Sequence, residues 1–243
     1  MHTDSAVDKE VKVKIEKVEE LLSTTKLENK PGAIIYSADS TLVKGDFYFL
    51  GQNPGGNDED KYGEDTILNQ LVNSGEHNEY TEGNWSGPYG KMHQNNIKEM
   101  FEDLDIDINK TFSTNLNFVR SGHTGKYPGG DEMFNWHASL LWPIHEYFLS
   151  IVKPKVIISN GDKARKIISK NYLQDKNNYD EVELDKLYRS RKQKCKSQDG
   201  VLTIYDKKLK VRIISIFHLS KWEYKDYKKG VGWLRSKINQ AIG

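Results

Sequence analysis

The chain has 243 residues, of which 36% are hydrophobic and 29% are charged. This length and composition suit one α/β domain, or at most two small ones, and exclude a generally disordered protein. No apolar run approaches the roughly 20 residues that a membrane helix needs. The polar first ten residues predict no signal peptide. A single cysteine, Cys195, excludes an internal disulfide and a cysteine-based metal cluster, so we expect a cytoplasmic protein without membrane contact.

The net charge of +1 conceals an uneven distribution along the chain. Residues 1–152 hold 13 Lys or Arg and 25 Asp or Glu, for a net charge of −12. Residues 153–243 hold 23 and 10, for a net charge of +13. A basic part of this size is typical of proteins that bind polyanions. A solvated, lysine-rich surface explains it about equally well, so charge alone leaves two interpretations.

The spacing of apolar residues predicts helices that alternate with strands. Helices are expected at residues 7–22, weakly at 58–74, from about 91, at 131–151, after 160 and at 230–242. Strands are expected at 46–50, 111–119, 155–159 and 211–217. Such alternation predicts a single three-layer α/β/α domain around a mostly parallel sheet. We expect residues 1–30 to form an N-terminal helix packed on this domain, which spans 31–243.

A charged stretch interrupts the pattern between residues 171 and 208. It contains the basic sequence YRSRKQKCK at 188–196, and we expect a helix–loop insertion here. The basic cluster either contacts phosphate groups or forms a solvated surface, and the second interpretation is slightly favoured.

Four segments end predicted strands, and ligands of open α/β sheets bind at the carboxyl ends of strands. The segments are GQNPGG (51–56), TNLN (114–117), SNGD (159–162) and FHLSKW (217–222). The glycine turn lacks the phosphate-loop pattern, no serine lies in a nucleophile elbow, and the histidines lack metal-binding spacing. No segment is specific by itself, and we expect neither a metal nor a cofactor.

In this order and spacing, the four segments resemble the uracil-DNA glycosylase superfamily from Asp46 to the C-terminus. GQNPGG is similar to the first catalytic motif of that family, and FHLSKW stands where the family has HPSP. The stretch from GPYGKMHQ (87–94) to TN, and PKVIISNGDKARKII (154–168), are similar to its iron–sulfur branch. The chain departs from the family in three ways. It lacks the cluster cysteines, has Leu219 in place of proline, and has the long stretch at 171–208.

The resemblance implies an enzyme that flips a pyrimidine out of DNA and hydrolyses its N-glycosidic bond. Negative charge develops on the departing base, so neutral donors in a dry pocket stabilise it. Gly51 and Gln52 would lie against the base, and His218 would donate a hydrogen bond to the base anion. Asn53 would position the attacking water, because an amide oxygen can hold water but cannot accept a proton as a carboxylate does.

By the same resemblance, Asn115 reads the base edge through its amide, and Trp85 stacks on the base. Asn117 is the alternative to Asn115, because side chains two residues apart in a strand point the same way. The loop that enters the minor groove of DNA would consist of Leu219, Ser220, Lys221 and Trp222.

Each of these assignments has a purely structural alternative. Residues 53–56 can form an ordinary strand-to-helix turn, and Asn115 can cap the end of a strand. His218 can be a hydrogen-bonded core histidine, and Trp85 can anchor a loop.

One position bears on the choice of substrate. Uracil-specific members of the family have a Tyr in the first motif that blocks the 5-methyl group of thymine, and Gly55 is the matching residue here. Glycine leaves space beside C5, which favours 5-substituted pyrimidines, including large modifications found in phage DNA. Three functions stay open: a monomeric DNA glycosylase for repair or defence, a nucleic-acid-binding protein of this fold without turnover, and, least favoured, an enzyme that acts on free nucleosides.

Overall fold

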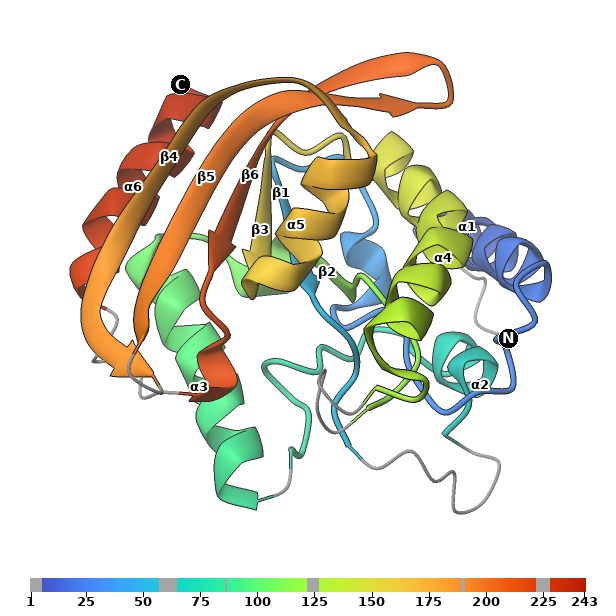
Figure 1. The fold of residues 1–243 in the computed structure, drawn as a ribbon. Coiled ribbons are helices and arrows are strands. Elements are labelled where there is room, and N and C mark those ends of the chain that lie inside the picture. Colours follow the sequence, from blue (N-terminus) through green and yellow to red (C-terminus); the bar gives the residue numbers. More distant parts are fainter. Residues whose placement is uncertain (1–5, 57–64, 86, 122–126, 189–190, 222–227) are drawn as a thin grey trace.

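The computed structural model describes residues 6–56, 65–85, 87–121, 127–188, 191–221 and 228–243. It is an α/β fold with a six-stranded sheet and helices on both faces (Figure 1). The helices are α1 (Ala6–Ser23), α2 (Ile67–Val72), α3 (Gly87–Asp103), α4 (Gly130–Val152), α5 (Asp162–Asn171) and α6 (Lys228–Ile242). The strands are β1 (Phe47–Gly51), β2 (Phe112–Asn115), β3 (Val156–Asn160), β4 (Leu173–Tyr188), β5 (Arg191–Ile204) and β6 (Lys207–Ile216).

The sheet has the strand order β2-β1-β3-β6-β5-β4. The first four strands are parallel, and β5 and β4 continue the sheet antiparallel. Gly51 at the end of β1 lies opposite Asn115 at the end of β2, and Asn160 at the end of β3 lies opposite Ile216 of β6. The carboxyl ends of all four parallel strands therefore meet at one edge of the sheet.

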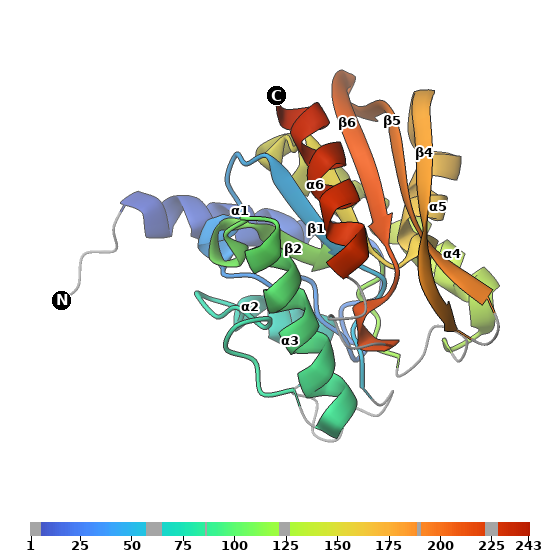
Figure 2. The same ribbon diagram turned by 90° about the vertical axis from the view of Figure 1, so that its left-hand side faces the viewer.

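The alternation of side chains along the strands divides the core into two parts. Tyr48 and Leu50 of β1 pack with α1, α4 and α5 on one face, whereas Phe49 packs with α3 and α6 on the other. Figure 2 shows α6 and α5 on opposite sides of the sheet. The sheet thus lies between two layers of helices, as the alternating pattern predicts.

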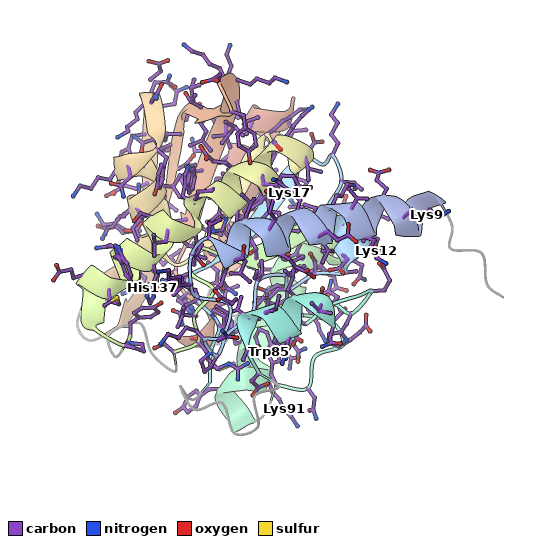
Figure 3. The ribbon with its side chains drawn as sticks, turned by 90° about the vertical axis from the view of Figure 1, so that its right-hand side faces the viewer. Lys9, Lys12, Lys17, Trp85, Lys91 and His137 are labelled. Carbon is purple, nitrogen blue, oxygen red and sulfur yellow. The ribbon has the colours of Figure 1, made fainter. Side chains whose placement is uncertain are left out.

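Helix α1 packs along the outside of the α4 layer. Val18 and Leu22 are fully buried in the core that α4 also lines. Lys9 and Lys12 lie on its exposed side, which Figure 3 shows. Among the described residues, no helix has the length and apolar character that a membrane crossing requires.

The expected helix–loop insertion at 171–208 is wrong, because these residues form β4 and β5. Val182 pairs with Cys195, and the apolar positions Val182 and Leu184 alternate with charged ones. Lys194 forms ion pairs with Glu181 and Glu183 across the two strands. An outer ribbon with one face in water needs this alternation, and its many charges conceal the strand pattern in the sequence.

The β4–β5 ribbon also extends past the end of β6. Pairing between β5 and β6 starts at Lys196 and Ser215, whereas β4 and β5 remain paired as far as Tyr188 and Arg191. In Figure 1 the end of the ribbon lies near the 3₁₀ turn η4 (Leu219–Lys221) that follows β6. The ribbon thus reaches the edge at which the parallel strands end.

A buried histidine supports the end of β2 from the α4 side. His145 is 1% exposed, donates from Nε2 to the carbonyl of Leu116 (3.1 Å), and accepts at Nδ1 from the Tyr48 hydroxyl (3.0 Å). Burial lowers the pKa of His145 to about 4. Its imidazole is therefore neutral in the folded protein at neutral pH.

We predict that acid weakens the fold through His145. Between pH 6.5 and 4 the unfolded chain binds a proton at this residue and the folded chain does not, so stability is present above pH 6.5 and is lost as the pH falls. The free energy of unfolding should fall by about 3 kcal/mol from this group over that interval. Urea unfolding at several pH values measures it, and His145→Gln should flatten the slope. The same slope in His145→Gln as in the natural protein would contradict the prediction.

Candidate functional site

The end of β1 contacts the end of β2 more closely than any side chain on residue 51 would allow. A Cβ atom at Gly51 would overlap Oδ1 of Asn115, so only glycine fits there. Asn115 is 4% exposed, and its Nδ2 is buried without a hydrogen-bond partner in the described part of the chain. The Tyr36 hydroxyl lies beside this amide, but no hydrogen bond of ordinary geometry joins them. Burial, and then the charge of Glu79, raises the pKa of Tyr36 well above its usual value.

Asn117 does not share the direction of Asn115, because β2 ends at Asn115. Its Nδ2 donates to the carbonyl of Phe134 in α4 (3.2 Å). Its Oδ1 accepts from the Tyr127 hydroxyl (2.8 Å) and from the backbone N–H of Val119 (3.2 Å). Asn117 is therefore a structural residue of the core, and Asn115 is the amide at the carboxyl edge.

The end of β3 supplies an amide whose orientation is fixed. Asn160 is 2% exposed, and its Oδ1 accepts from the backbone N–H of Leu219 (3.0 Å). Its Nδ2 faces Nε2 of His93 in α3 (2.8 Å). Because Nδ2 can only donate, Nε2 of His93 is the acceptor, and a neutral His93 has its proton on Nδ1. Asn160 thus connects the turn after β6 to α3.

His218 follows the last strand of the parallel group and is half-buried. Its Nδ1 lies 2.8 Å from Oγ of Ser220 and accepts from the backbone N–H of Ser220 at 3.4 Å. This arrangement favours the neutral tautomer with the proton on Nε2, which makes Nε2 a hydrogen-bond donor.

Aromatic rings connect the two sides of the edge. The Tyr36 ring lies 6.4 Å from Trp85, Trp85 lies 5.3 Å from His93, and His93 lies 5.0 Å from His218. These side chains, with the amides at the ends of β2 and β3, lie at the carboxyl edge as a connected series. We call this set the carboxyl-edge ring: Asn115, Tyr36, Trp85, His93, His218 and Asn160.

Trp85 has the contacts of a loop anchor as well as a place in the ring. Its Nε1 donates to Glu79 (3.0 Å), and its ring meets Tyr80 edge-on. Figure 3 shows Trp85 beside the beginning of α3, near Lys91. It is half-buried, so the structural alternative accounts for its fixed position, and stacking on a base stays a prediction.

The first motif is held by contacts to neighbouring loops. Gln52 is 9% exposed and packs against Gly161, where φ is 107° and a Cβ would overlap its Nε2. Nδ2 of Asn53 donates to the carbonyls of Pro54 (2.8 Å) and Ser121 (3.0 Å). With both amide hydrogens used in this way, the orientation of Asn53 is set, and Oδ1 is its acceptor for a further partner.

Gly55 borders open space. No described atom lies within 4 Å of a Cβ placed there, and its φ is not in the left-handed region. The next residue, Gly56, has a φ of 115° and packs against the side chain of Arg120. A Cβ at residue 55 therefore clashes with none of the described residues, and its φ carries no left-handed penalty.

The structure corrects one part of the proposed DNA-contacting loop. Leu219 is 1% exposed and belongs to the core beneath α3 and α6, which contradicts its expected place on a loop that enters DNA. Its carbonyl also accepts from Asn96 (2.7 Å), so the backbone is held inward. Ser220 contacts His218, the backbone of Lys221 lies in η4, and Trp222 lies outside the described residues.

Sequence reasoning did not assign several residues of the site. Asn160 belongs to SNGD, a segment at the end of a predicted strand, as Asn115 belongs to TNLN. The strand-end rule could therefore have identified Asn160 from the sequence. An antiparallel bridge between Ile35 and Thr114 places Tyr36 beside β2. His93 lies in the second turn of α3. These two positions depend on tertiary packing, and no local pattern marks them.

Asp162, which begins α5 just after β3, forms ion pairs with Arg165 and Lys196. Burial raises the pKa of Asp162, but hydrogen bonds from Arg165 (2.6 Å) and Lys196 (2.8 Å) outweigh it and lower the pKa to about 2. In the described residues, no group of three or more His, Cys, Asp or Glu side chains could hold a metal ion.

Two hollows, with volumes of about 350 and 630 Å³, lie at the opposite end of the parallel strands. Both include Arg212 and Gln240 in their walls. Arg212 binds Asp199 through two nitrogens and the carbonyl of Lys237 through a third contact, so its donors serve the fold. Among the described residues, Asn115 at the carboxyl edge has a buried polar atom without a partner, and no residue that lines these hollows has one.

No model of a known protein family matches the chain, and no curated protein matches it in sequence.

We predict that Gly51→Ala lowers the free energy of unfolding by about 1–3 kcal/mol, because its Cβ displaces the Asn115 amide. Adding Asn115→Ala removes the overlapping atom and should reduce this loss, which a double-mutant cycle in urea measures. Gly232→Ala is the control, because a Cβ there in α6 meets nothing within 4 Å and should raise stability by about 0.5–1 kcal/mol. Equal losses from Gly51→Ala with and without Asn115 would show that the two residues do not conflict.

Proposed function

We propose that the protein is a DNA glycosylase with a fold of the uracil-DNA glycosylase type. In this proposal it flips a pyrimidine out of DNA, either uracil or a 5-modified base, and hydrolyses the N-glycosidic bond to leave an abasic site. The observation that carries the proposal is the carboxyl-edge ring, which brings Asn115 from β2 and His218 from β6 to one edge.

The chemistry of the ring suits a departing base. The glycosidic bond breaks to an oxocarbenium-like sugar and an anionic base, so stabilisation needs neutral donors fixed before the reaction. Every member of the ring is an amide, an imidazole, a phenol or an indole. In the favoured tautomer, Nε2 of His218 donates a hydrogen bond to the oxygen on which charge develops. Asn115 reads the base edge beside it.

Asn53 has the role of a water-positioner in this proposal. Its Nδ2 is held by two carbonyls, so its Oδ1 has a fixed direction before a substrate binds. An amide oxygen can accept a hydrogen bond from water but has no proton affinity at neutral pH. Asn53 therefore directs the water to the sugar carbon without taking its proton. The reaction depends on the departure of the pyrimidine.

A DNA partner agrees with the distribution of charge. Residues 153–243 have a net charge of +13, and the β4–β5 ribbon extends to the carboxyl edge. The sequence 188–196, which includes the end of the ribbon, holds five Lys or Arg and no Asp or Glu. Lysine and arginine that contact phosphates supply most of the affinity of such proteins for DNA.

A second function is a protein of the same fold that binds nucleic acid without turnover. The burial of Leu219 favours this alternative, because Leu219 is then not free to fill the gap that a flipped base leaves. The third candidate, an enzyme for free nucleosides, has no use for the basic C-terminal part. The formation of abasic sites separates the first function from the other two.

We predict alkali-sensitive strand scission on at least one oligonucleotide that contains uracil, 5-hydroxymethyluracil, a G:T mismatch or glucosylated hydroxymethylcytosine. Activity should persist in EDTA. Asn53→Ala and His218→Ala should each lower the single-turnover rate by roughly 100-fold or more, as loss of a preorganised polar group does. DNA affinity should change little, and the exposed control Asn73→Ala should retain the natural rate. A folded protein that is inactive on all four substrates would support the binding protein.

We predict that Gly55→Tyr selectively lowers excision of 5-substituted pyrimidines relative to uracil, because the phenol fills the open space beside C5. Residue 55 has no left-handed φ, so the substitution tests bulk without backbone strain. The measurement is the ratio of single-turnover rates on matched oligonucleotides, with Gly55→Ala as the control of small volume. If Gly55→Tyr and the natural protein give the same ratio, Gly55 does not face C5.

A further inference from the structure

Arg120 presents a buried donor that the protein does not use. Its Nε is buried and has no hydrogen-bond partner in the described part of the chain. Nη1 of the same side chain forms an ion pair with Asp65 (3.0 Å), and the side chain is 19% exposed. A buried donor without a partner destabilises the folded state, and more so when the group is charged. A buried donor of this kind is therefore rare in folded proteins unless a water or a ligand accepts its hydrogen bond.

The position of Arg120 is fixed beside the first motif. Its backbone N–H donates to the carbonyl of Pro31 (2.7 Å), and the next residue, Ser121, donates to the carbonyl of Pro54 (2.9 Å). Its Cδ lies 3.1 Å from where a Cβ on Gly56 would be. The side chain thus packs against Gly56 of GQNPGG, one residue after Gly55.

Arg120 also acts on a member of the carboxyl-edge ring. Its positive charge lowers the pKa of Tyr36, against the larger effects of burial and Glu79. Tyr36 in turn lies beside Asn115. The guanidinium is thus near enough to Tyr36 to act on its hydroxyl while the stem packs against Gly56, so Arg120 connects the first motif with the residues proposed to face the base edge.

We propose that Nε of Arg120 donates a hydrogen bond to an oxygen on the C5 substituent of the flipped pyrimidine. This inference rests on the proposed glycosylase function. A guanidinium has only donors, so its partner is an acceptor, and a methyl group offers none. The substrate class is therefore pyrimidines with an oxygen on the C5 substituent, such as 5-hydroxymethyl bases and their sugar conjugates, in preference to thymine.

The test compares single-turnover excision of 5-hydroxymethyluracil and thymine in otherwise identical oligonucleotides. These two bases differ by one oxygen. Arg120→Met keeps an unbranched stem and removes every donor, and it should lower the rate ratio of hydroxymethyl to methyl substrate at least tenfold. Arg120→Lys keeps a charge for Asp65 without the Nε donor and should lower the ratio as well. Lys110→Met, which removes an exposed charge before β2, should leave the ratio unchanged.

Several results would overturn the inference. Equal losses on both substrates in Arg120→Met would assign Arg120 a purely structural role. The same drop in ratio from Asp65→Asn, which breaks the ion pair and leaves Nε intact, would do so too. Excision of uracil and thymine without any preference for the hydroxymethyl base would overturn the inference and leave the glycosylase function standing. Inactivity on every substrate would overturn both.

A second ratio covers the case in which thymine is not excised. The affinities of His218→Ala protein for the two oligonucleotides should favour the hydroxymethyl base, and adding Arg120→Met should abolish this preference. Equal affinities of His218→Ala protein for both would contradict the inference.

Discussion

The site depends on how closely two parallel strands approach at Gly51 and Asn115. Because residue 51 has no side chain, the Asn115 amide occupies the space beside β1, and the paired strands place it at the carboxyl edge. β3 and β6 continue the same parallel arrangement and bring Asn160 and His218 to that edge. The other members of the carboxyl-edge ring are then held by contacts with these amides or with one another.

The carboxyl-edge ring contains no Asp, Glu, Lys or Arg, and charged groups lie beside it. Glu79 accepts from Trp85, and Arg120 binds Asp65. An unpaired charge inside a dry site costs far more than a neutral amide with an incomplete set of hydrogen bonds. Both charges act on Tyr36 in opposite directions, because Glu79 raises its pKa and Arg120 lowers it.

Much of the fold was predictable from the sequence because its helices and four inner strands have regular apolar spacing. The strand-end rule selected the segments TNLN and FHLSKW, and the resemblance to the uracil-DNA glycosylase superfamily then indicated Asn115 and His218 within them. The expected place of Leu219 on a loop that enters DNA was wrong, because its side chain is buried in the core. Its backbone N–H also donates to Asn160, which a motif position does not reveal. Tyr36 could not be predicted, because the bridge between Ile35 and Thr114 that brings it to β2 joins residues 79 positions apart and leaves no local pattern.

The β4–β5 ribbon makes β6 an inner strand of the sheet. Without it, β6 would be a border strand, and its unpaired N–H and C=O groups would be open to pairing with a second chain. With it, residues 211–216 are buried, and the border passes to β4, where Asp180, Glu181 and Glu183 interrupt any apolar surface. The charged stretch thus protects the strand that leads to His218 from self-association.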